Sequence, residues 1–373
     1  MSSIKLNDFK VQLKIGPFGA MVGREGSEVQ VGKGIPGGGQ SMIAWVVRDP
    51  GDLARRPLRL EEVPEPDPGP GEVRLKVRAC GVCRTDLHIA EGELMPPRLP
   101  VIPGHQVVGA VDRVGPGVAG IGLRERRGAY WLHSSCGRCP ACSRGEENLC
   151  PDARFLGFHA DGGFAEYVVI PAEYTVPIPD AFCDSQAAPL LCAGIIGYRA
   201  LRLAELRPGE TLALFGFGAS AHLVLQVAHH WGCRVVVYTR SRSRQEMARA
   251  LGAVWSGPPG ESPLLADRAI TFAPAGWVVL EALKAVRPGG TVAVNAVYMS
   301  DVPSFPYRVI YGERTLRTVA NVTRKDAAEF MQVAAEVPVT ARVVQYPFHQ
   351  ADQALLDLKE GKVDGAAVLL LGR

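Results

Sequence analysis

The sequence lacks a long uninterrupted apolar run, and it lacks an excess of charge of one sign. No apolar stretch approaches the roughly 18 residues that span a bilayer. The 41 basic residues nearly balance the 38 acidic residues, which leaves a net charge of +3. So small an excess argues against binding to nucleic acid or to a membrane surface. The N-terminal residues contain Lys5, Asp8 and Lys10 but no apolar segment, so no secretory signal is predicted. We expect a cytoplasmic protein.

Cysteine, in contrast, is plentiful for a cytoplasmic chain. There are nine cysteines, and they are unevenly spaced, with four of them inside one run of fifteen residues. In a reducing compartment, clustered cysteines indicate metal binding or catalysis more often than disulfides. The sequence therefore directs attention to metal sites.

Changes of pattern along the 373 residues predict two domains behind an N-terminal extension. We expect residues 1–41, which are rich in glycine towards their end, to be disordered. From 42 to 192, short strands separated by proline and glycine predict an irregular, partly barrel-like β domain. From 193 to 321, strands alternate with helical runs, which predicts a doubly wound parallel sheet and an α/β class. Residues 322–373 add helices and a closing strand.

The four clustered cysteines have the spacing of a closed metal site. Thiolates are soft ligands, and four of them fill the tetrahedral sphere of Zn²⁺ without leaving an open position. An iron–sulfur cluster is the rival interpretation, but the seven-residue last gap is too long for the bacterial ferredoxin pattern. A closed site binds no substrate, so we expect this zinc to hold a loop in shape. Its predicted ligands are Cys136, Cys139, Cys142 and Cys150.

A second candidate metal site is scattered along the chain. Cys83 begins the run Cys-Arg-Thr-Asp-Leu-His, His105 follows Pro-Gly, and Cys192 lies in an apolar segment before Gly194. A catalytic zinc needs about three protein ligands and one exchangeable position, and these residues make a Cys₂His set. Taken singly, each is weak, because a lone histidine or cysteine is more often structural.

A glycine-rich turn predicts a dinucleotide site. Gly216 and Gly218 follow the predicted strand 211–215 and precede a predicted helix, while Ala221 replaces the third glycine of the usual fingerprint. These residues allow a tight turn and place a pyrophosphate at the helix N-terminus. The alternative is a plain structural turn between a strand and a helix.

The end of the next predicted strand bears on the choice between NAD and NADP. Sites for NAD place a carboxylate there, about 20 residues beyond the glycines. This chain instead has Thr239, Arg240 and Ser241, whose guanidinium and hydroxyl groups suit a 2′-phosphate. We therefore favour NADP over NAD, with a solvated arginine-rich loop as the alternative.

Taken together, these motifs carry a resemblance over residues 42–373. The run from Cys83 to His88, the Gly104-His105 pair, the four-cysteine loop, the Cys192 segment and the glycine-rich turn come in this order. In this order the chain resembles the zinc-containing alcohol dehydrogenases of the medium-chain dehydrogenase/reductase family. The resemblance implies a GroES-like catalytic domain, a Rossmann cofactor domain, and hydride transfer between an alcohol or aldehyde and NAD(P).

The resemblance also implies roles for individual residues. Cys83, His105 and Cys192 match the catalytic zinc ligands. Thr85 matches the hydroxyl residue that contacts the alcohol, His88 the proton-relay histidine, Asp86 the carboxylate behind the ligand histidine, and Arg84 a residue at the cofactor pyrophosphate. Chemistry agrees, since zinc lowers the pKa of an alcohol and the released proton needs an exit. One departure is Gln106, where the family commonly has glutamate after the ligand histidine.

Trp131, Leu132 and Phe155 are candidates for the substrate pocket, because the resemblance places such residues at the cleft. Large apolar walls would suit primary alcohols of medium or aromatic character and the matching aldehydes. The family is generally dimeric or tetrameric, so we expect a homodimer or homotetramer.

Two other functions compete with alcohol oxidation. A C=C or quinone reductase of the same fold usually lacks the zinc ligands, which this chain has. A zinc-holding structural or redox-sensing protein would not need Thr85 and His88 beside a complete ligand set. Zinc content discriminates among the three, with two zinc ions per chain expected for the alcohol dehydrogenase.

Overall fold

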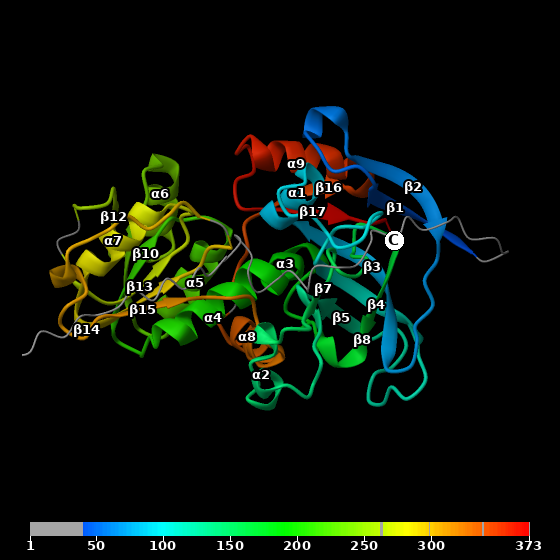
Figure 1. Cartoon of the computed structure of the whole chain (residues 1–373), viewed down its shortest axis with the longest axis horizontal. Helices are drawn as coiled ribbons and strands as arrows, with labels where there is room; N and C mark the ends of the chain where they lie inside the picture. Colours follow the sequence, from blue (N-terminus) through cyan, green and yellow to red (C-terminus); the bar gives the residue numbers. More distant parts are fainter. Residues whose placement is uncertain (1–39, 262–263, 298, 338, 373) are drawn as a thin grey trace, which may run out of the picture.

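The computed structural model describes residues 40–261, 264–297, 299–337 and 339–372. The predicted disordered extension of residues 1–41 lies outside this part of the chain, except for its last two residues. Figure 1 shows two bodies side by side, one built on each of two large sheets, with α4 (Ile195–Ala204) and α8 (Arg324–Glu336) between them. The architecture is mixed α/β, as predicted.

The first sheet has seven strands and draws on both ends of the described chain. Its main path pairs strands in the order β16-β17-β3-β4-β5-β9, and β8 pairs with β3. Register shifts interrupt the long pairing of β3 with β4, and such bulges bend strands into a barrel-like shape. The strand bounds are β3 Glu72–Val82, β4 Gln106–Val114, β5 Arg126–Ala129, β8 Tyr167–Pro171, β9 Thr175–Pro177, β16 Val343–Pro347 and β17 Ala366–Leu370. A hairpin of β1 (Ser41–Val47) and β2 (Leu58–Pro64) precedes them.

The second sheet has six strands, all paired in parallel, in the order β12-β11-β10-β13-β14-β15. Its bounds are β10 Thr211–Phe215, β11 Arg234–Tyr238, β12 Trp255–Gly257, β13 Ala266–Thr271, β14 Val286–Val294 and β15 Thr315–Thr318. Every residue of β10 is buried, as expected for a parallel strand covered on both faces. This strand order is the doubly wound topology predicted from the alternating pattern.

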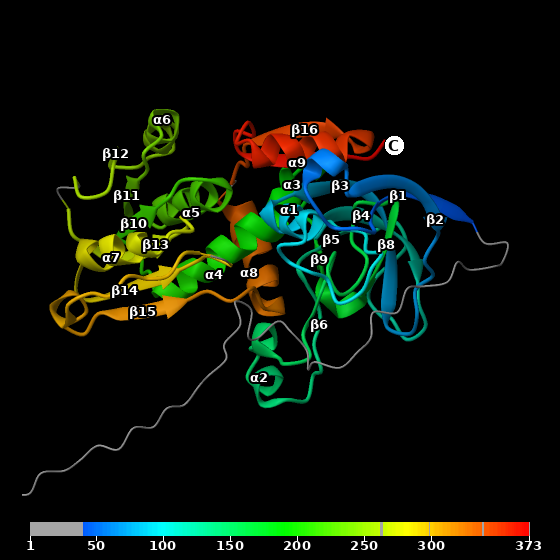
Figure 2. The ribbon, with the colours of Figure 1, turned by 45° about the horizontal axis from the view of Figure 1, so that its top comes forward.

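Alternate residues of β10 face different cores. Leu212 and Leu214 belong to the larger core with α5 (Ala219–His230), whereas Ala213 and Phe215 pack in a second core with α7 (Gly276–Ala285). Figure 2 shows these helices around the sheet, with α6 (Arg242–Ala250) next to β12 at the top of the view. Because successive side chains of a strand point to opposite faces, this one strand contributes to the cores on both sides of the sheet.

A continuous helical run, Asp184–Ala204, joins the two bodies and is long and apolar enough to cross a membrane by length and composition. Within the fold, 61% of its most apolar window is buried, as in the core helix of a globular protein. The run is not uniform, because α3 (Asp184–Pro189) passes through a π-helical segment at Leu190–Gly194 before α4 begins. The expectation of a cytoplasmic protein stays a prediction.

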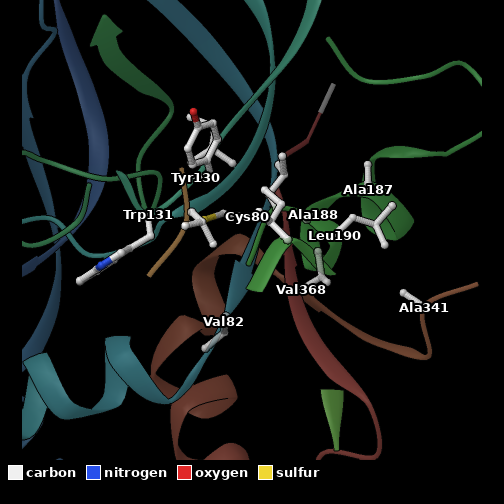
Figure 3. Close-up of a cluster of buried hydrophobic side chains, with 14 of the residues drawn as sticks. Cys80, Val82, Tyr130, Trp131, Ala187, Ala188, Leu190, Ala341 and Val368 are labelled. Carbon is white, nitrogen blue, oxygen red and sulfur yellow. The ribbon is translucent and has the colours of Figure 1, made fainter. Parts of the chain in front are cut away.

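One hydrophobic cluster ties together the elements that carry the candidate metal ligands. Figure 3 shows Cys80 and Val82 from β3, Trp131 from the segment after β5, and Leu190 from the π-helical segment around a common core. Cys83 follows Val82, and Cys192 lies two residues beyond Leu190. Close packing of this core therefore fixes where the ligands meet.

Candidate metal sites and cofactor cleft

The structure brings Cys83, His105 and Cys192 together from three separate parts of the chain. Their ligand atoms all lie within 4.8 Å of one another, and Cys83 Sγ is 3.3 Å from His105 Nε2. In a tetrahedral zinc site, bonds of about 2.0–2.3 Å put neighbouring donors roughly 3.5–3.8 Å apart. The donor types and spacing therefore fit a zinc ion with three protein ligands and a fourth position left over.

The Cys83 thiol is positioned by the start of helix α1 (Arg84–Glu91). Cys83 is the N-cap residue, and its sulfur accepts a hydrogen bond from the Thr85 backbone N–H at 3.3 Å. The Asp86 carboxylate accepts in return from the Cys83 N–H at 2.9 Å, which completes a capping box. The hydrogen bonds that cap α1 therefore orient the Cys83 side chain.

Asp86 also reaches the loop that carries His105. Its Oδ1 accepts from the Gly104 N–H at 3.0 Å and lies 3.2 Å from His105 Nδ1, the ring nitrogen remote from Cys83. Asp86 is fully buried. One carboxylate therefore links the two segments that carry Cys83 and His105.

Gly104 is required beside His105 for steric and conformational reasons. Its φ is +98°, and a Cβ placed there would lie 2.5 Å from the Phe164 ring. On its other side, the His105 ring meets the Trp131 indole edge to face, with centroids 5.0 Å apart. The histidine is therefore held by backbone conformation and by an aromatic wall.

Cys192 lies in the π-helical segment, which sequence patterns did not predict. Pro189 precedes this segment and has no N–H to donate to the helical ladder. π-Helical turns recur at functional sites. Gly194, in the same segment, packs so tightly against α8 that an added Cβ would lie 2.3 Å from the Phe330 ring. Helix α8 thus supports the turn that carries the third candidate ligand.

The three groups polarise one another. A hydrogen bond from the Cys192 thiol holds the pKa of Cys83 well below its ordinary value, against burial, and the His105 charge adds to the effect. The same hydrogen bond, together with burial, raises the pKa of Cys192. Burial opposes the charged form of His105, but the charges of Cys83 and Asp86 outweigh burial and raise the pKa of His105. Zinc binds the thiolate and neutral imidazole forms of these groups, so a bound zinc ion would take the place of the protons that they share.

Other predicted site residues lie along α1 and at the start of β4. Thr85 and His88 are both half-buried on α1, whereas Arg84 is exposed. Gln106 is buried, and its amide packs on Gly81 of β3 so closely that a Cβ on Gly81 would lie 2.5 Å from Oε1. The His88 Nδ1 atom contacts the carboxylate of Glu93, a residue that the sequence patterns did not single out.

The four-cysteine loop forms a compact cluster away from the first site. The ligand atoms of Cys136, Cys139, Cys142 and Cys150 lie within 4.8 Å of one another, and all four cysteines are free thiols. Backbone N–H groups point at the sulfurs: Cys150 Sγ accepts from Cys136 N and Asp152 N, each at 3.4 Å. Backbone hydrogen bonds from Arg138 and Cys139 lower the pKa of Cys136 to about 6. These features suit a closed zinc site.

The predicted cofactor turn connects β10 to α5. Gly216 has φ +89°, and Gly218 caps the helix, where an added Cβ would meet no atom within 4 Å. Ala221 is fully buried and allows close packing of the helix. Open space over Gly218 at a helix N-terminus is the geometry that admits a pyrophosphate. His222 is buried, and its Nε2 accepts from the Arg342 backbone N–H, so it serves the fold.

The end of β11 places Thr239, Arg240 and Ser241 one after another before α6. Thr239 is buried, Ser241 caps α6 by accepting from Arg244 N at 3.4 Å, and Arg240 is exposed. Within the described ranges Arg240 forms no ion pair. Its guanidinium is available to an anionic ligand.

The three pocket candidates lie in different surroundings. Trp131 stacks on Phe155 with centroids 5.0 Å apart and also contacts the His105 ring, so it adjoins the metal site. Leu132 and Phe155 pair between β6 (Leu132–Ser134) and β7 (Arg154–Phe155), and both are buried. A cavity of about 1190 Å³ lies elsewhere, between β3, β16 and β17. It is lined by none of the predicted site residues.

Comparisons with known proteins agree with this geometry. Residues 69–180 match the alcohol dehydrogenase GroES-like domain, and residues 219–336 match the zinc-binding dehydrogenase family. The protein named "Probable alcohol dehydrogenase AdhA" of Mycobacterium tuberculosis is 45% identical over 89% of this chain and 98% of its own length. An alcohol dehydrogenase of Geobacillus stearothermophilus is 36% identical over 85% and 96%. The solved structure of a cinnamyl alcohol dehydrogenase from Sorghum bicolor, 27% identical, superimposes with a TM-score of 0.81 over 88% of this chain and 97% of that one.

Proposed function

Because the chain belongs to the zinc-containing medium-chain alcohol dehydrogenases, and is thus an NAD(P)-dependent oxidoreductase with a catalytic and a structural zinc site, we propose that it acts on primary alcohols or their aldehydes with NADP. The observation that carries the catalytic assignment is the convergence of Cys83, His105 and Cys192, with Thr85 and His88 following Cys83 on α1. We propose that residues 42–192 and 322–373 form the catalytic domain and that residues 193–321 form the cofactor domain.

In this proposal, Cys83, His105 and Cys192 hold the catalytic zinc. When bound, zinc polarises the substrate oxygen and nicotinamide exchanges a hydride with the substrate carbon. Asp86 fixes the ligand geometry, because it bonds the backbone beside two of the three ligands. The Trp131 indole excludes water from one side of the His105 ring. Electrostatic interactions inside the site are stronger where water is excluded.

Thr85 and His88 give the alcohol proton a route out of the site. Thr85 lies two residues after the Cys83 ligand. Its hydroxyl can both donate and accept a hydrogen bond, as a proton relay requires. His88 lies nearly one turn further along α1, where its ring is 30% exposed. A hydroxyl followed by a partly exposed imidazole passes a proton from a dry site towards water.

The preference for NADP rests on the end of β11. Thr239 and Ser241 offer hydroxyl groups and Arg240 offers an exposed guanidinium where an NAD site would have a carboxylate. Arg84, exposed at the start of α1, is proposed to meet the pyrophosphate that rests on Gly216, Gly218 and Ala221. The measurement is kcat/KM with each coenzyme at saturating benzyl alcohol, and a strong preference for NAD would overturn this assignment.

The substrate proposal rests on aromatic side chains close to the zinc ligands. Trp131 adjoins His105 and stacks on Phe155, which offers a flat apolar wall to an aromatic or medium-length chain. Leu132 supports that wall from the core. A panel of primary and secondary alcohols, together with a zinc assay, tests this point. Two zinc ions per chain with turnover exclude the sensor alternative, and exclusive activity on C=C bonds or quinones would favour the reductase alternative.

Self-association into a homodimer or homotetramer is proposed from the edge of the six-stranded sheet. All four residues of β15 are exposed, and this edge strand ends its sheet. Leu316 on the strand and the nearby Tyr307 and Tyr311 expose apolar surface. An unpaired edge with apolar neighbours is a template for a second strand. Light scattering should give at least a dimer, and L316K should shift it towards the monomer; a monomeric wild-type chain would contradict this proposal.

A further inference from the structure

A carboxylate lies directly against the candidate relay histidine, and the backbone holds it there. Helix α1 ends at Gly92, whose φ of +79° turns the chain back on itself. The Gly92 N–H donates to Ile89 C=O at 3.2 Å, and the Leu94 N–H donates to His88 C=O at 3.0 Å. This closed turn places Glu93 opposite His88, and the Glu93 carboxylate contacts His88 Nδ1. The pairing therefore follows from helix termination as well as from side-chain attraction.

The neighbouring cation Lys359 forms its ion pairs with other carboxylates, although its charge also acts on Glu93 at longer range. Lys359 of α9 (Ala351–Lys359) packs over this end of α1, but its ammonium is 2.5 Å from Glu91 and 3.8 Å from Asp52. Over the described part of the chain, His88 is the only ion-pair partner of Glu93. The Glu93 side chain is 62% exposed, against 30% for His88. A proton that passed from His88 to Glu93 would therefore move from a half-buried group to one that is mostly in contact with water.

We propose that Glu93 is a positioning residue for proton release through His88, an inference that rests on the relay role of His88 in the proposed function. The carboxylate accepts the Nδ1–H bond, which fixes the tautomer and leaves the Nε2 lone pair free to take a proton. When Nε2 gains that proton, the Nδ1 proton passes to the Glu93 carboxylate and then to water. One proton enters the pair and one leaves, so the net charge of the pair is restored. The ring is then left with its proton on Nε2, and proton exchange with water at the partly exposed ring restores the Nδ1–H tautomer.

The test compares E93Q with E91Q, a matched control two residues earlier, at the end of α1, whose carboxylate pairs with Lys359 instead. Single-turnover oxidation of benzyl alcohol is followed with the preferred coenzyme at neutral pH. We expect E93Q to slow the turnover about tenfold, a fraction of the effect of a general base. KM values from separate steady-state measurements and the zinc content should stay unchanged, and E93D should recover most of the rate. E91Q should behave as wild type.

Rescue by a small carboxylate separates a role in proton release from a structural one. At fixed pH and ionic strength, formate should raise the rate of E93Q and E93A in proportion to its concentration and leave wild type unaffected. A purely structural loss would not respond to formate. If E93Q also lowers the Tm, E93A in formate decides: recovery supports the proposal and its absence overturns it.

H88Q distinguishes failure of this inference from failure of the relay itself. If H88Q slows the turnover while E93Q matches E91Q, the role of Glu93 is overturned and the relay stands. If H88Q also matches wild type, then the relay assignment fails, and the role of Glu93 fails with it. Slowing by both H88Q and E93Q, with rescue of the latter, supports both.

Discussion

At the scale of single residues, the Asp86 side chain holds two of the segments that carry the candidate zinc ligands. It is fully buried and accepts hydrogen bonds from Cys83 N and Gly104 N, next to two candidate zinc ligands. Burial raises the pKa of Asp86, although the nearby His105 charge opposes this. A buried carboxylate with such contacts is tolerated because its partners compensate for the lost hydration.

Asp86→Asn tests this role directly. The amide keeps the size of the side chain, but its NH₂ group would face one of the two backbone donors. We expect the catalytic zinc to be held about 10–100-fold less tightly, as for other groups behind metal ligands. Zinc competition with a chelator measures the change. D184N, at a carboxylate that pairs with Arg126, is the control, and equal zinc retention in both variants would contradict the prediction.

Gln106 departs from the family pattern expected from the sequence, which has glutamate after the ligand histidine. Its neutral amide is buried against Gly81. We predict that Gln106→Glu stays active with an altered kcat, because the new charge changes the surroundings of the metal without removing a ligand. Steady-state kinetics with metal analysis measure this. Complete loss of activity at full zinc content would count against the interpretation.

At the scale of elements, helix α8 is anchored by one buried carboxylate. Asp326 forms a capping box with Thr323 and is 2.6 Å from both Arg199 and Arg202 of α4. Burial opposes ionisation of Asp326, but hydrogen bonds from Thr323 and the charge of Arg199 outweigh it, so its pKa is lowered. Because Phe330 of α8 packs on Gly194, this anchoring also supports the segment that carries Cys192.

Asp326→Asn should lower the free energy of unfolding by about 3 kcal/mol, because it leaves the mostly buried Arg199 guanidinium without its counter-charge, whereas Arg202 keeps Glu329. A lowered folded-state pKa contributes stability above the ordinary value of 3.8, and this contribution is lost as pH falls through the folded-state value. The gap between wild type and variant should therefore be constant near neutrality and narrow below about pH 4. Urea melts from pH 3 to pH 7 measure it, and a gap that widens on acidification would contradict the assignment.

At the scale of the whole molecule, the four-cysteine loop lies against the segment by which the chain returns from the six-stranded sheet. Asn148 Nδ2 donates to Ala320 C=O at 2.5 Å, and Glu147 accepts from Arg324 Nε at 2.9 Å. Both Glu147 and Asn148 are buried. The loop therefore braces the start of α8, although it takes no part in the chemistry.

Cys142→Ser should remove zinc from this loop and leave the catalytic zinc in place. We expect one zinc ion per chain, and a half-life of activity at raised temperature shortened by roughly tenfold or more, because a structural metal stabilises the folded state. C183S, an exposed cysteine outside both clusters, is the control. Two zinc ions per chain in C142S, or an unchanged half-life, would contradict the prediction.

The sequence by itself determined the sites whose residues lie close together in the chain. The ligands of the four-cysteine loop lie within fifteen residues, and the turn at Gly216 and Gly218 lies between its own strand and helix. Chain connectivity alone brings such residues together, so their types and intervals predicted a zinc loop and a cofactor turn. The change from irregular strands to alternating strands and helices likewise predicted both kinds of sheet.

Only the tertiary structure decided the meeting of residues far apart in the chain. Cys83 and Cys192 are joined by the packing of β3 against the helical run that begins at Asp184. The π-helical segment at Cys192 and the bond from Gly104 to Asp86 have no local signature, because each depends on neighbours from other elements. Side-chain packing and burial fix these contacts, and they arise only when the chain has folded.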